Sequence, residues 1–173
     1  PVSGDVYADM DDVPLDDPAV YEMLARGGTS GVFQFESSLA TDKLRAMRCD
    51  RFEDLVATNA LIRPGPLDAG MTDVYIERKL GREPVAFAHP DLEETLDPTY
   101  GIIVYQEQVM RIANVLAEFS LGEADVLRKA VGKKNAKLIA KELGKFTERA
   151  IANGVDKKTA TDLAEQIETF GRY

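Results

Sequence analysis

The chain has 173 residues, 45% of them hydrophobic and 29% charged, which is the composition of an ordinary water-soluble globular domain. A net charge of −9 argues against a free-standing, non-specific nucleic-acid binder, and the uncharged runs are too short to cross a membrane. One cysteine and one histidine exclude an internal disulfide and a His/Cys zinc site, and the lone Cys49 fits a reducing cytoplasm.

Residues 1–15 are acidic and contain four spaced aspartates, Asp5, Asp9, Asp11 and Asp12. Such aspartates can hold a divalent metal, but no glycine at a turn position and no downstream bidentate glutamate complete a calcium loop. We therefore interpret residues 1–15 as an acidic linker and residues 16–173 as one domain. Because the chain starts at Pro1, without a methionine or a signal sequence, we expect it to be a piece of a longer protein.

The domain is predicted to be mainly α-helical, with a few short strands or extended segments. Asp17 and Pro18 occupy the N-cap and first position of a short helix that ends at Gly27-Gly28. Residues 32–35 form a candidate strand, and residues 38–47 a second helix.

The next helix opens at Asp50-Arg51-Phe52-Glu53, and its spacing places Phe52, Leu55, Val56 and Ala60 on its buried side. It stops at Arg63-Pro64-Gly65-Pro66-Leu67, where two prolines flanking a glycine predict a rigid, non-helical corner. A stiff loop that presents Arg63 is suited to phosphate binding, because the guanidinium is ordered in advance. The alternative is a helix stop with a surface arginine.

A helix over residues 69–80, capped by Gly81, is followed by a helical turn that begins at His89. With no second histidine in the chain, His89 is interpreted as a turn residue. Residues 100–105 form the clearest strand or extended segment. They lead into a helix at Gln106 whose apolar stripe is Val109, Ile112, Ala113 and Leu116.

The segment Ser120–Lys134 contains the most informative pattern. Ser120 and Glu123 have the spacing of a capping box, and Gly132 stands where a left-handed C-terminal cap is expected. Cations gather over the last turn of this helix and just beyond it: Arg128, Lys129, Lys133 and Lys134. The negative end of the helix dipole favours cations there, but a polyanionic partner explains so many of them better.

Residues 128–149 carry eight Lys or Arg against two Glu, a net charge of +6, so the remainder of the chain carries −15. A long helix over residues 135–152 turns Ile139, Leu143, Phe146 and Ala150 inward. Its Lys137, Lys141 and Lys145 share an outward face at i, i+4 spacing. A last helix begins at Asp156 with an apolar stripe of Leu163, Ile167 and Phe170. The basic strip has two interpretations, a solvated helix face or an electrostatic binding surface.

No catalytic constellation is complete in this chain, since there is neither a nucleophile–histidine set with plausible spacing nor a Walker-type glycine-rich loop. Glu93 and Glu94 are most simply solvated. The residues supply phosphate-binding groups instead: Arg63, Arg128, Lys129, Lys133 and Lys134. Cations around a triphosphate neutralise the charge that shifts toward the leaving group in nucleotidyl transfer, a reaction that also needs carboxylate-bound metals.

Several segments resemble, in order, the motifs of bacterial DNA polymerase III α subunits, the C-family replicative polymerases. They are Val13–Asp17, Gly31–Ser37, Ala60–Leu67, Pro98–Met110 and Ser120–Lys134. The resemblance covers essentially all 173 residues, and the form of residues 100–108 is closer to the main replicative enzyme than to its error-prone relative.

The resemblance implies a helical fingers domain, truncated at its C-terminus, that binds the incoming dNTP triphosphate and template DNA during 5′–3′ primer extension. The family's metal-binding aspartates lie in the preceding palm, so the Mg²⁺ ligands of the intact enzyme are expected outside this chain, which should be inactive alone. Implied partners are primer–template DNA and, in the intact cytoplasmic enzyme, the sliding clamp and other replisome subunits. The fragment itself is expected to be monomeric.

This sequence departs from the family pattern at two functional positions. Lys129 replaces a usual arginine, which keeps the charge but loses the bidentate fork. Thr41 occupies a position that is usually basic, with Lys43 or Arg45 as possible substitutes. Lys137, Lys141 and Lys145 are the candidates for DNA contact. The alternative function is a non-enzymatic acidic helical module that docks an anionic partner through its basic strip.

Overall fold

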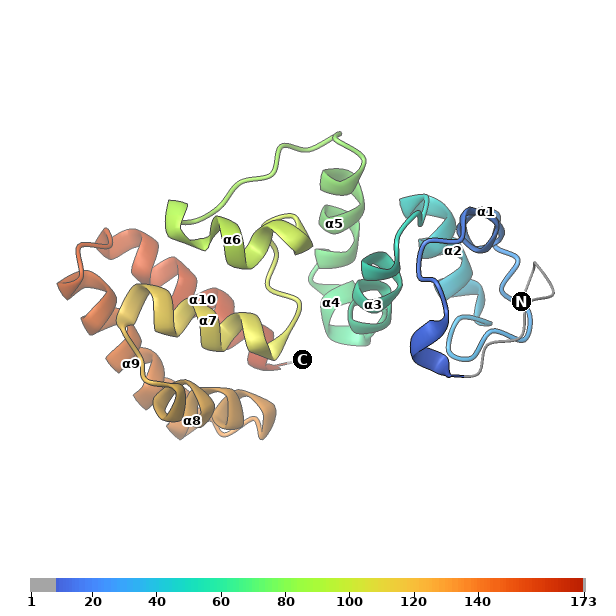
Figure 1. The fold of residues 1–173 in the computed structure, drawn as a ribbon. Helices are drawn as coiled ribbons and strands as arrows, with labels where there is room; N and C mark the ends of the chain where they lie inside the picture. The colour runs from blue at the N-terminus through green and yellow to red at the C-terminus, as the bar shows by residue number, and fades with distance from the viewer. Residues whose placement is uncertain (1–8, 173) are drawn as a thin grey trace. The chain divides into compact units, whose positions relative to one another are not determined.

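The computed structural model describes residues 9–172, except for the side chain of residue 172. Within this range the chain forms ten α-helices and three short 3-10 helices and no β-strand, so the mainly helical prediction is confirmed (Figure 1). The chain divides into two compact units, residues 1–62 and residues 63–173.

The predicted acidic linker falls at the start of the first unit, and its first eight residues lie outside the described range. The remainder contains one 3-10 turn, Met10–Asp12. Asp9 caps this turn, because its carboxylate accepts from the backbone N–H of Asp11 at 3.3 Å.

Three helices form the rest of the first unit: α1 (Pro18–Ala25), α2 (Ser38–Met47) and α3 (Phe52–Leu61). The predicted cap at Asp17 is confirmed, since its carboxylate accepts from the N–H of Ala19 at 2.9 Å. The buried apolar residues of this unit are Tyr21, Leu24, Ala40, Leu44, Met47, Cys49, Ala57 and Leu61.

The predicted strand at residues 32–35 is wrong. Two successive turns replace it: the N–H of Val32 bonds to the carbonyl of Thr29, and the N–H of Phe35 to that of Val32, both at 3.0 Å. The Glu36 carboxylate accepts from the N–H of Gly31 at 2.8 Å and closes the loop on itself. This local hydrogen bonding outweighs the strand propensity of the apolar residues.

The predicted buried face of α3 is also wrong for two of its residues. Phe52 and Val56 are 40% and 43% exposed, whereas Asp54 and Thr58 are fully buried. Asp54 tolerates burial because Arg51 donates to its carboxylate at 3.2 Å, and the Thr58 hydroxyl donates to the Asp54 carbonyl. A satisfied polar pair therefore faces inward where the apolar spacing predicted the opposite.

The second unit opens with α4 (Pro64–Asp68) and α5 (Met71–Lys79). The rigid, non-helical corner predicted for residues 63–67 is wrong, because these residues start a short helix with Arg63 as its N-cap. Pro64 and Pro66 both lie in the first turn, where the N–H groups that proline lacks have no helical partner.

The predicted helical turn at His89 is confirmed. A 3-10 helix, Pro90–Leu92, leads into α6 (Glu93–Leu96) and a second 3-10 helix, Asp97–Thr99. The His89 ring accepts from the backbone N–H of Asp91 at 3.3 Å, which makes it the cap of the turn.

The predicted strand or extended segment at residues 100–105 is wrong at its start, where Tyr100 and Gly101 have φ of 55° and 79°. Residues 102–104 belong to no helix or strand, and a buried glutamine bonds this segment. The Gln108 carbonyl oxygen accepts from the N–H groups of Val104 and Tyr105 at 2.8 and 3.0 Å. Its amide nitrogen donates to the Thr99 hydroxyl at 2.7 Å and to the Thr95 carbonyl at 3.2 Å. The Gln108 side chain thus accepts the backbone hydrogen bonds that a neighbouring strand would otherwise accept.

Four helices form the main core of the second unit: α7 (Gln106–Ala117), α8 (Leu121–Gly132), α9 (Ala136–Ala152) and α10 (Lys157–Arg172). α8 packs against α7 and α9, and α9 packs against α10 (Figure 1). The predicted apolar stripes are buried here, with Phe170 partly so: Val109, Ile112, Ala113, Leu116, Ile139, Leu143, Phe146, Ala150, Leu163 and Ile167. Asp156 caps α10 as predicted, by accepting from the N–H of Thr159 at 3.1 Å.

No helix among residues 9–172 combines the length and the apolar character that crossing a bilayer requires.

Candidate phosphate-binding interface on helices α8 and α9

The N-terminus of α8 is fixed by the predicted capping box. The Glu123 N–H donates to the Ser120 hydroxyl at 3.3 Å, and the Glu123 carboxylate accepts from the Ser120 N–H at 3.0 Å. Two N–H groups that a helix start leaves unpaired are therefore satisfied, and the phase of α8 is set from its first turn.

The C-terminal cap of α8 lies two residues later than predicted. Gly132 is helical, and Lys134 adopts the left-handed conformation with φ 52°. The N–H of Lys134 bonds to the carbonyl of Val131, and that of Asn135 to the carbonyl of Ala130, both at 3.0 Å, which is a Schellman motif. A Cβ at Gly132 would lie 3.3 Å from the end of the Gln106 side chain.

The two predicted phosphate ligands inside α8 share one carboxylate. Asp125 Oδ1 accepts from Arg128 Nε and Nη2 at 3.0 and 2.7 Å, and its Oδ2 lies 2.6 Å from Lys129 Nζ. Hydrogen bonds from Lys129 and then Arg128 lower the pKa of Asp125. Sequence reasoning missed Asp125, although its i, i+3 and i, i+4 spacing to the two cations is a signal for such pairs.

Four lysines follow at the α8–α9 turn and on the first half of α9. We call them the turn lysines: Lys133, Lys134, Lys137 and Lys141. All four side chains are exposed, and within residues 9–172 none has an ion pair or a side-chain hydrogen bond. They therefore keep their full charge and all their donors for a ligand.

Lys145 has different surroundings from the other lysines of α9. Its ammonium lies 3.0 and 3.1 Å from the two carboxylate oxygens of Glu142, a side chain that is only 4% exposed. This ion pair stabilises the fold, because a buried carboxylate needs a compensating charge.

The last cation of the basic strip, Arg149, joins α9 to the start of α8. It donates to both Glu123 oxygens, at 2.7 and 3.2 Å, and its guanidinium lies 5.0 Å from the ring centroid of Phe119. The hydrogen bond from Arg149, followed by that from the Ser120 backbone, lowers the pKa of Glu123 to about 2. The Glu123 carboxylate thus both caps α8 and bonds α8 to α9.

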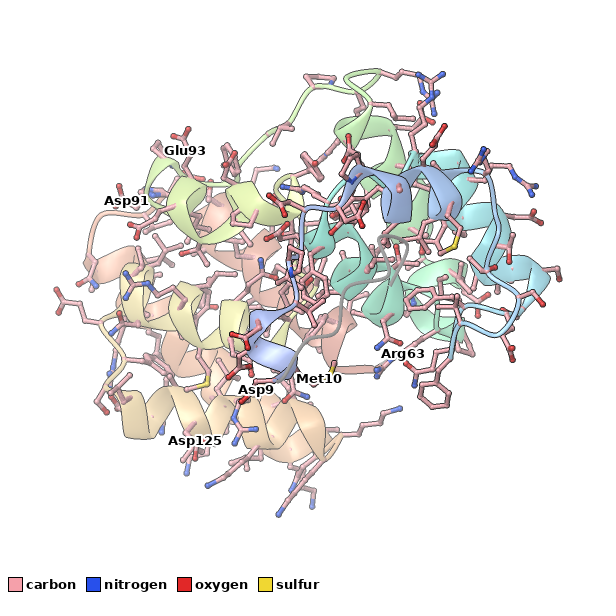
Figure 2. The ribbon with its side chains drawn as sticks, turned by 45° about the vertical axis from the view of Figure 1, so that its right-hand side comes forward. Asp9, Met10, Arg63, Asp91, Glu93 and Asp125 are labelled. Atoms are coloured by element: carbon pink, nitrogen blue, oxygen red, sulfur yellow. The ribbon has the colours of Figure 1, made fainter. Side chains whose placement is uncertain are left out.

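Arg63 comes from a different element, the start of α4, whereas Asp125 marks the middle of α8 (Figure 2). Its side chain is exposed, with no ion pair or side-chain hydrogen bond within residues 9–172. The structure brings Arg128 and Lys129 together through Asp125. It shows no bond that holds Arg63 to that group.

Thr41, which stands where the resembled family usually has a basic residue, is used structurally. Its hydroxyl lies 2.7 Å from the Thr29 hydroxyl and 3.3 Å from the carbonyl of Phe35, so it ties the 29–35 turns to α2. The proposed substitutes are also engaged: Arg45 bonds to Asp42 and to the carbonyl of Arg26, and Lys43 has a partner.

A metal centre is not evident in the described part of the chain. No group of three or more His, Cys, Asp or Glu side chains within residues 9–172 could hold an ion. Glu93 and Glu94 lie in the first turn of α6, where carboxylates favour the positive end of the helix dipole.

Comparison with known proteins identifies the family. Residues 3–154 match the family described as the bacterial DNA polymerase III alpha subunit finger domain. The chain belongs to this finger-domain family. Its sequence is 49% identical over 162 residues to DNA polymerase III subunit alpha of Aquifex aeolicus, and 44% identical over 176 residues to that of Escherichia coli K12.

The finger domain is a small part of these relatives. The aligned residues cover 94% of this chain but 14% of the Aquifex aeolicus protein, and 99% of this chain but 15% of the Escherichia coli protein. The Haemophilus influenzae protein of the same name is 46% identical over 98% of the chain and 15% of its own length. The family resemblance inferred from residues 13–134 is therefore confirmed.

Proposed function

We propose that this finger domain works within a bacterial replicative DNA polymerase, where its basic strip binds the triphosphate of the incoming dNTP and the backbone of template DNA. The parent activity would be primer extension by nucleotidyl transfer in the cytoplasm, together with the sliding clamp and other replisome subunits. The domain itself is proposed to be monomeric.

The observation that carries this proposal is the group of unpaired turn lysines on an acidic chain. Paired surface cations are already partly neutralised, whereas these four retain their charge. α8 ends and α9 begins at the same turn, so the opposite partial charges of the two helix termini largely cancel there. The positive charge at this turn therefore comes from side chains. Flexible lysine side chains can move to contact the phosphates of a ligand.

We assign the cations to ligands as the family resemblance implies. Arg63, Arg128, Lys129, Lys133 and Lys134 are assigned to the triphosphate. Lys137 and Lys141, which continue outward along α9, are assigned to the DNA backbone. Contact between Lys145 and DNA stays a prediction, because such a contact would compete with the bond from Lys145 to Glu142.

The chemistry supplied by these side chains is electrostatic. Arginine and lysine donors hold the β- and γ-phosphates and stabilise the charge that develops on the leaving pyrophosphate. Mg²⁺, whose ligands we place in the preceding palm, would activate the primer hydroxyl. The finger domain would bind and orient the nucleotide, and we expect no primer extension by this chain alone.

The salt dependence of DNA binding tests the proposal. Affinity of the chain for primer–template DNA is measured by fluorescence anisotropy between about 50 and 200 mM salt. The log–log slope should approach about 0.9 per phosphate neutralised, and Lys133→Glu with Lys134→Glu should lower it by about two units.

A matched control carries the same charge change on α10. Lys157→Glu with Lys158→Glu reverses two lysines at the start of that helix, where Lys158 already pairs with Asp162 at 2.8 Å. This control should leave the slope within experimental error of the unmodified chain. Equal slopes for all three proteins would overturn the proposal and favour a basic strip that docks an acidic protein or serves only as a solvated surface.

A further inference from the structure

Asp125 uses its whole carboxylate on the two cations that follow it on α8. One oxygen accepts from Arg128 Nε and Nη2 at 3.0 and 2.7 Å, and the other lies 2.6 Å from Lys129 Nζ. All three side chains lie on one face of the helix, and Asp125 and Arg128 are each 33% exposed (Figure 2 labels Asp125). Both cations are therefore held in a single arrangement.

The bonds to Asp125 leave the useful donors of both cations free. A guanidinium has five N–H bonds, and Asp125 takes the edge formed by Nε and Nη2. Nη1 and the second hydrogen of Nη2 remain as a fork at the end of Arg128, the geometry that phosphate oxygens accept bidentately. Lys129 likewise keeps two of its three N–H bonds.

A carboxylate in this place has two opposite effects on an anionic ligand. Its negative charge repels the ligand and partly neutralises both cations. Its hydrogen bonds also fix two long side chains before the ligand arrives, which removes an ordering cost from binding. The turn lysines, which have no counter-ion within residues 9–172, already attract an anionic ligand. Arg128 and Lys129 would therefore contribute through the orientation of their hydrogen-bond donors.

We propose that Asp125 is a positioning residue, which orients Arg128 and Lys129 so that their free donors meet the phosphate oxygens of the bound nucleotide. This inference rests on the proposed function and extends it to a residue of the opposite charge. It makes a prediction of unexpected sign, since removal of a negative charge near an anion site should weaken anion binding.

The test is calorimetric titration of the chain with inorganic tripolyphosphate at low salt without divalent cations. Asp125→Asn changes the net charge from −9 to −8 and leaves one acceptor oxygen for two cations. We expect its dissociation constant to rise by about tenfold, the loss of pre-ordering for two side chains. Asp162→Asn, which makes the same charge change beside Lys158 on α10, should bind no more weakly than the unmodified chain.

Two further variants separate positioning from a fold defect. Asp125→Glu reaches the same two cations at i+3 and i+4 and should recover most of the affinity. In a background with Arg128→Ala and Lys129→Ala, the change Asp125→Asn should have no further weakening effect. Circular dichroism at matched temperatures checks that helix content is unchanged in every variant.

The outcomes distinguish the two proposals. If the chain does not bind tripolyphosphate, or if Lys133→Glu with Lys134→Glu leaves binding unaltered, the proposed function fails and the role of Asp125 fails with it. If binding depends on those lysines but Asp125→Asn binds equally or more tightly, only the positioning role is overturned. Weakening that persists in the background without the two cations also overturns it.

Discussion

Lys141 and Lys145 lie one helical turn apart on α9, but their ammonium groups have different surroundings. Lys141 is exposed and unpaired within residues 9–172, whereas Lys145 compensates the buried carboxylate of Glu142. Two residues of the same type and charge, on the same face, therefore differ: Lys145 pairs with a buried carboxylate, whereas Lys141 is available to the proposed ligand.

Alanine substitution should separate these two properties. Lys145→Ala leaves the Glu142 carboxylate without its counter-charge and should lower the free energy of unfolding by about 1–2 kcal/mol, less than for a fully buried pair because Lys145 is 40% exposed. Lys141→Ala should change it by less than about 0.5 kcal/mol. Urea denaturation measures both, and equal losses would show that the Glu142 bond contributes nothing to stability.

Helices α8 and α9 are joined by Arg149 and Glu123, so the cap of one helix depends on a residue of the other. Glu123 has a pKa of about 2 in the folded chain, below its ordinary value of 4.5. A lowered pKa means that the carboxylate stabilises the fold fully above about pH 4.5. The contribution is lost as the pH falls from there through 2.

Melting temperatures of Glu123→Gln and the unmodified chain should follow this pattern. At pH 7 the variant should melt at the lower temperature, because its amide cannot pair with Arg149 as a carboxylate does. The difference should shrink below pH 4.5 and nearly vanish at pH 2. Glu148→Gln, an exposed change on α9, serves as the control and should show a small difference at neutral pH. A gap for Glu123→Gln that is constant with pH would contradict the ion-pair explanation.

Elements whose ends are set by near neighbours in sequence were predictable. The caps at Asp17, Ser120 and Asp156 bond to N–H groups two or three residues away, so their spacing is sufficient information. The C-terminal cap of α8 was not predictable from its glycine, because Lys134 and not Gly132 adopts the left-handed conformation.

Some features of the candidate site likewise depend on local sequence, and others on contacts between distant residues. The density of cations over residues 128–149 is a property of the sequence and was predicted from it. Which of those cations are free depends on partners. The link from Asp125 to Arg128 was within reach of spacing rules, whereas Arg149 and Glu123 are 26 residues apart and meet only through the packing of α8 and α9.

The molecule as a whole consists of two units with unequal interiors. The main apolar core lies entirely within the second unit, formed by α6 to α10 with the segments between them. The first unit has about the size at which a single small core becomes marginal for independent folding.

We therefore expect residues 63–173, produced alone, to unfold in one cooperative thermal transition, since their core needs nothing from the first unit. Residues 1–62 alone should retain little helix at 25 °C. Far-ultraviolet circular dichroism of the two pieces measures this. A gradual, non-sigmoidal melt of residues 63–173 would show that their core depends on the rest of the chain.

The burial of Cys49 has a practical consequence. This thiol, which is 1% exposed, is the only one in the sequence, so thiol-specific dyes should find almost no background target in the native chain. A cysteine introduced at Lys157, an exposed residue at the start of α10, would then be the single labelled position. The domain is thereby suited to single-molecule fluorescence without prior removal of a native cysteine.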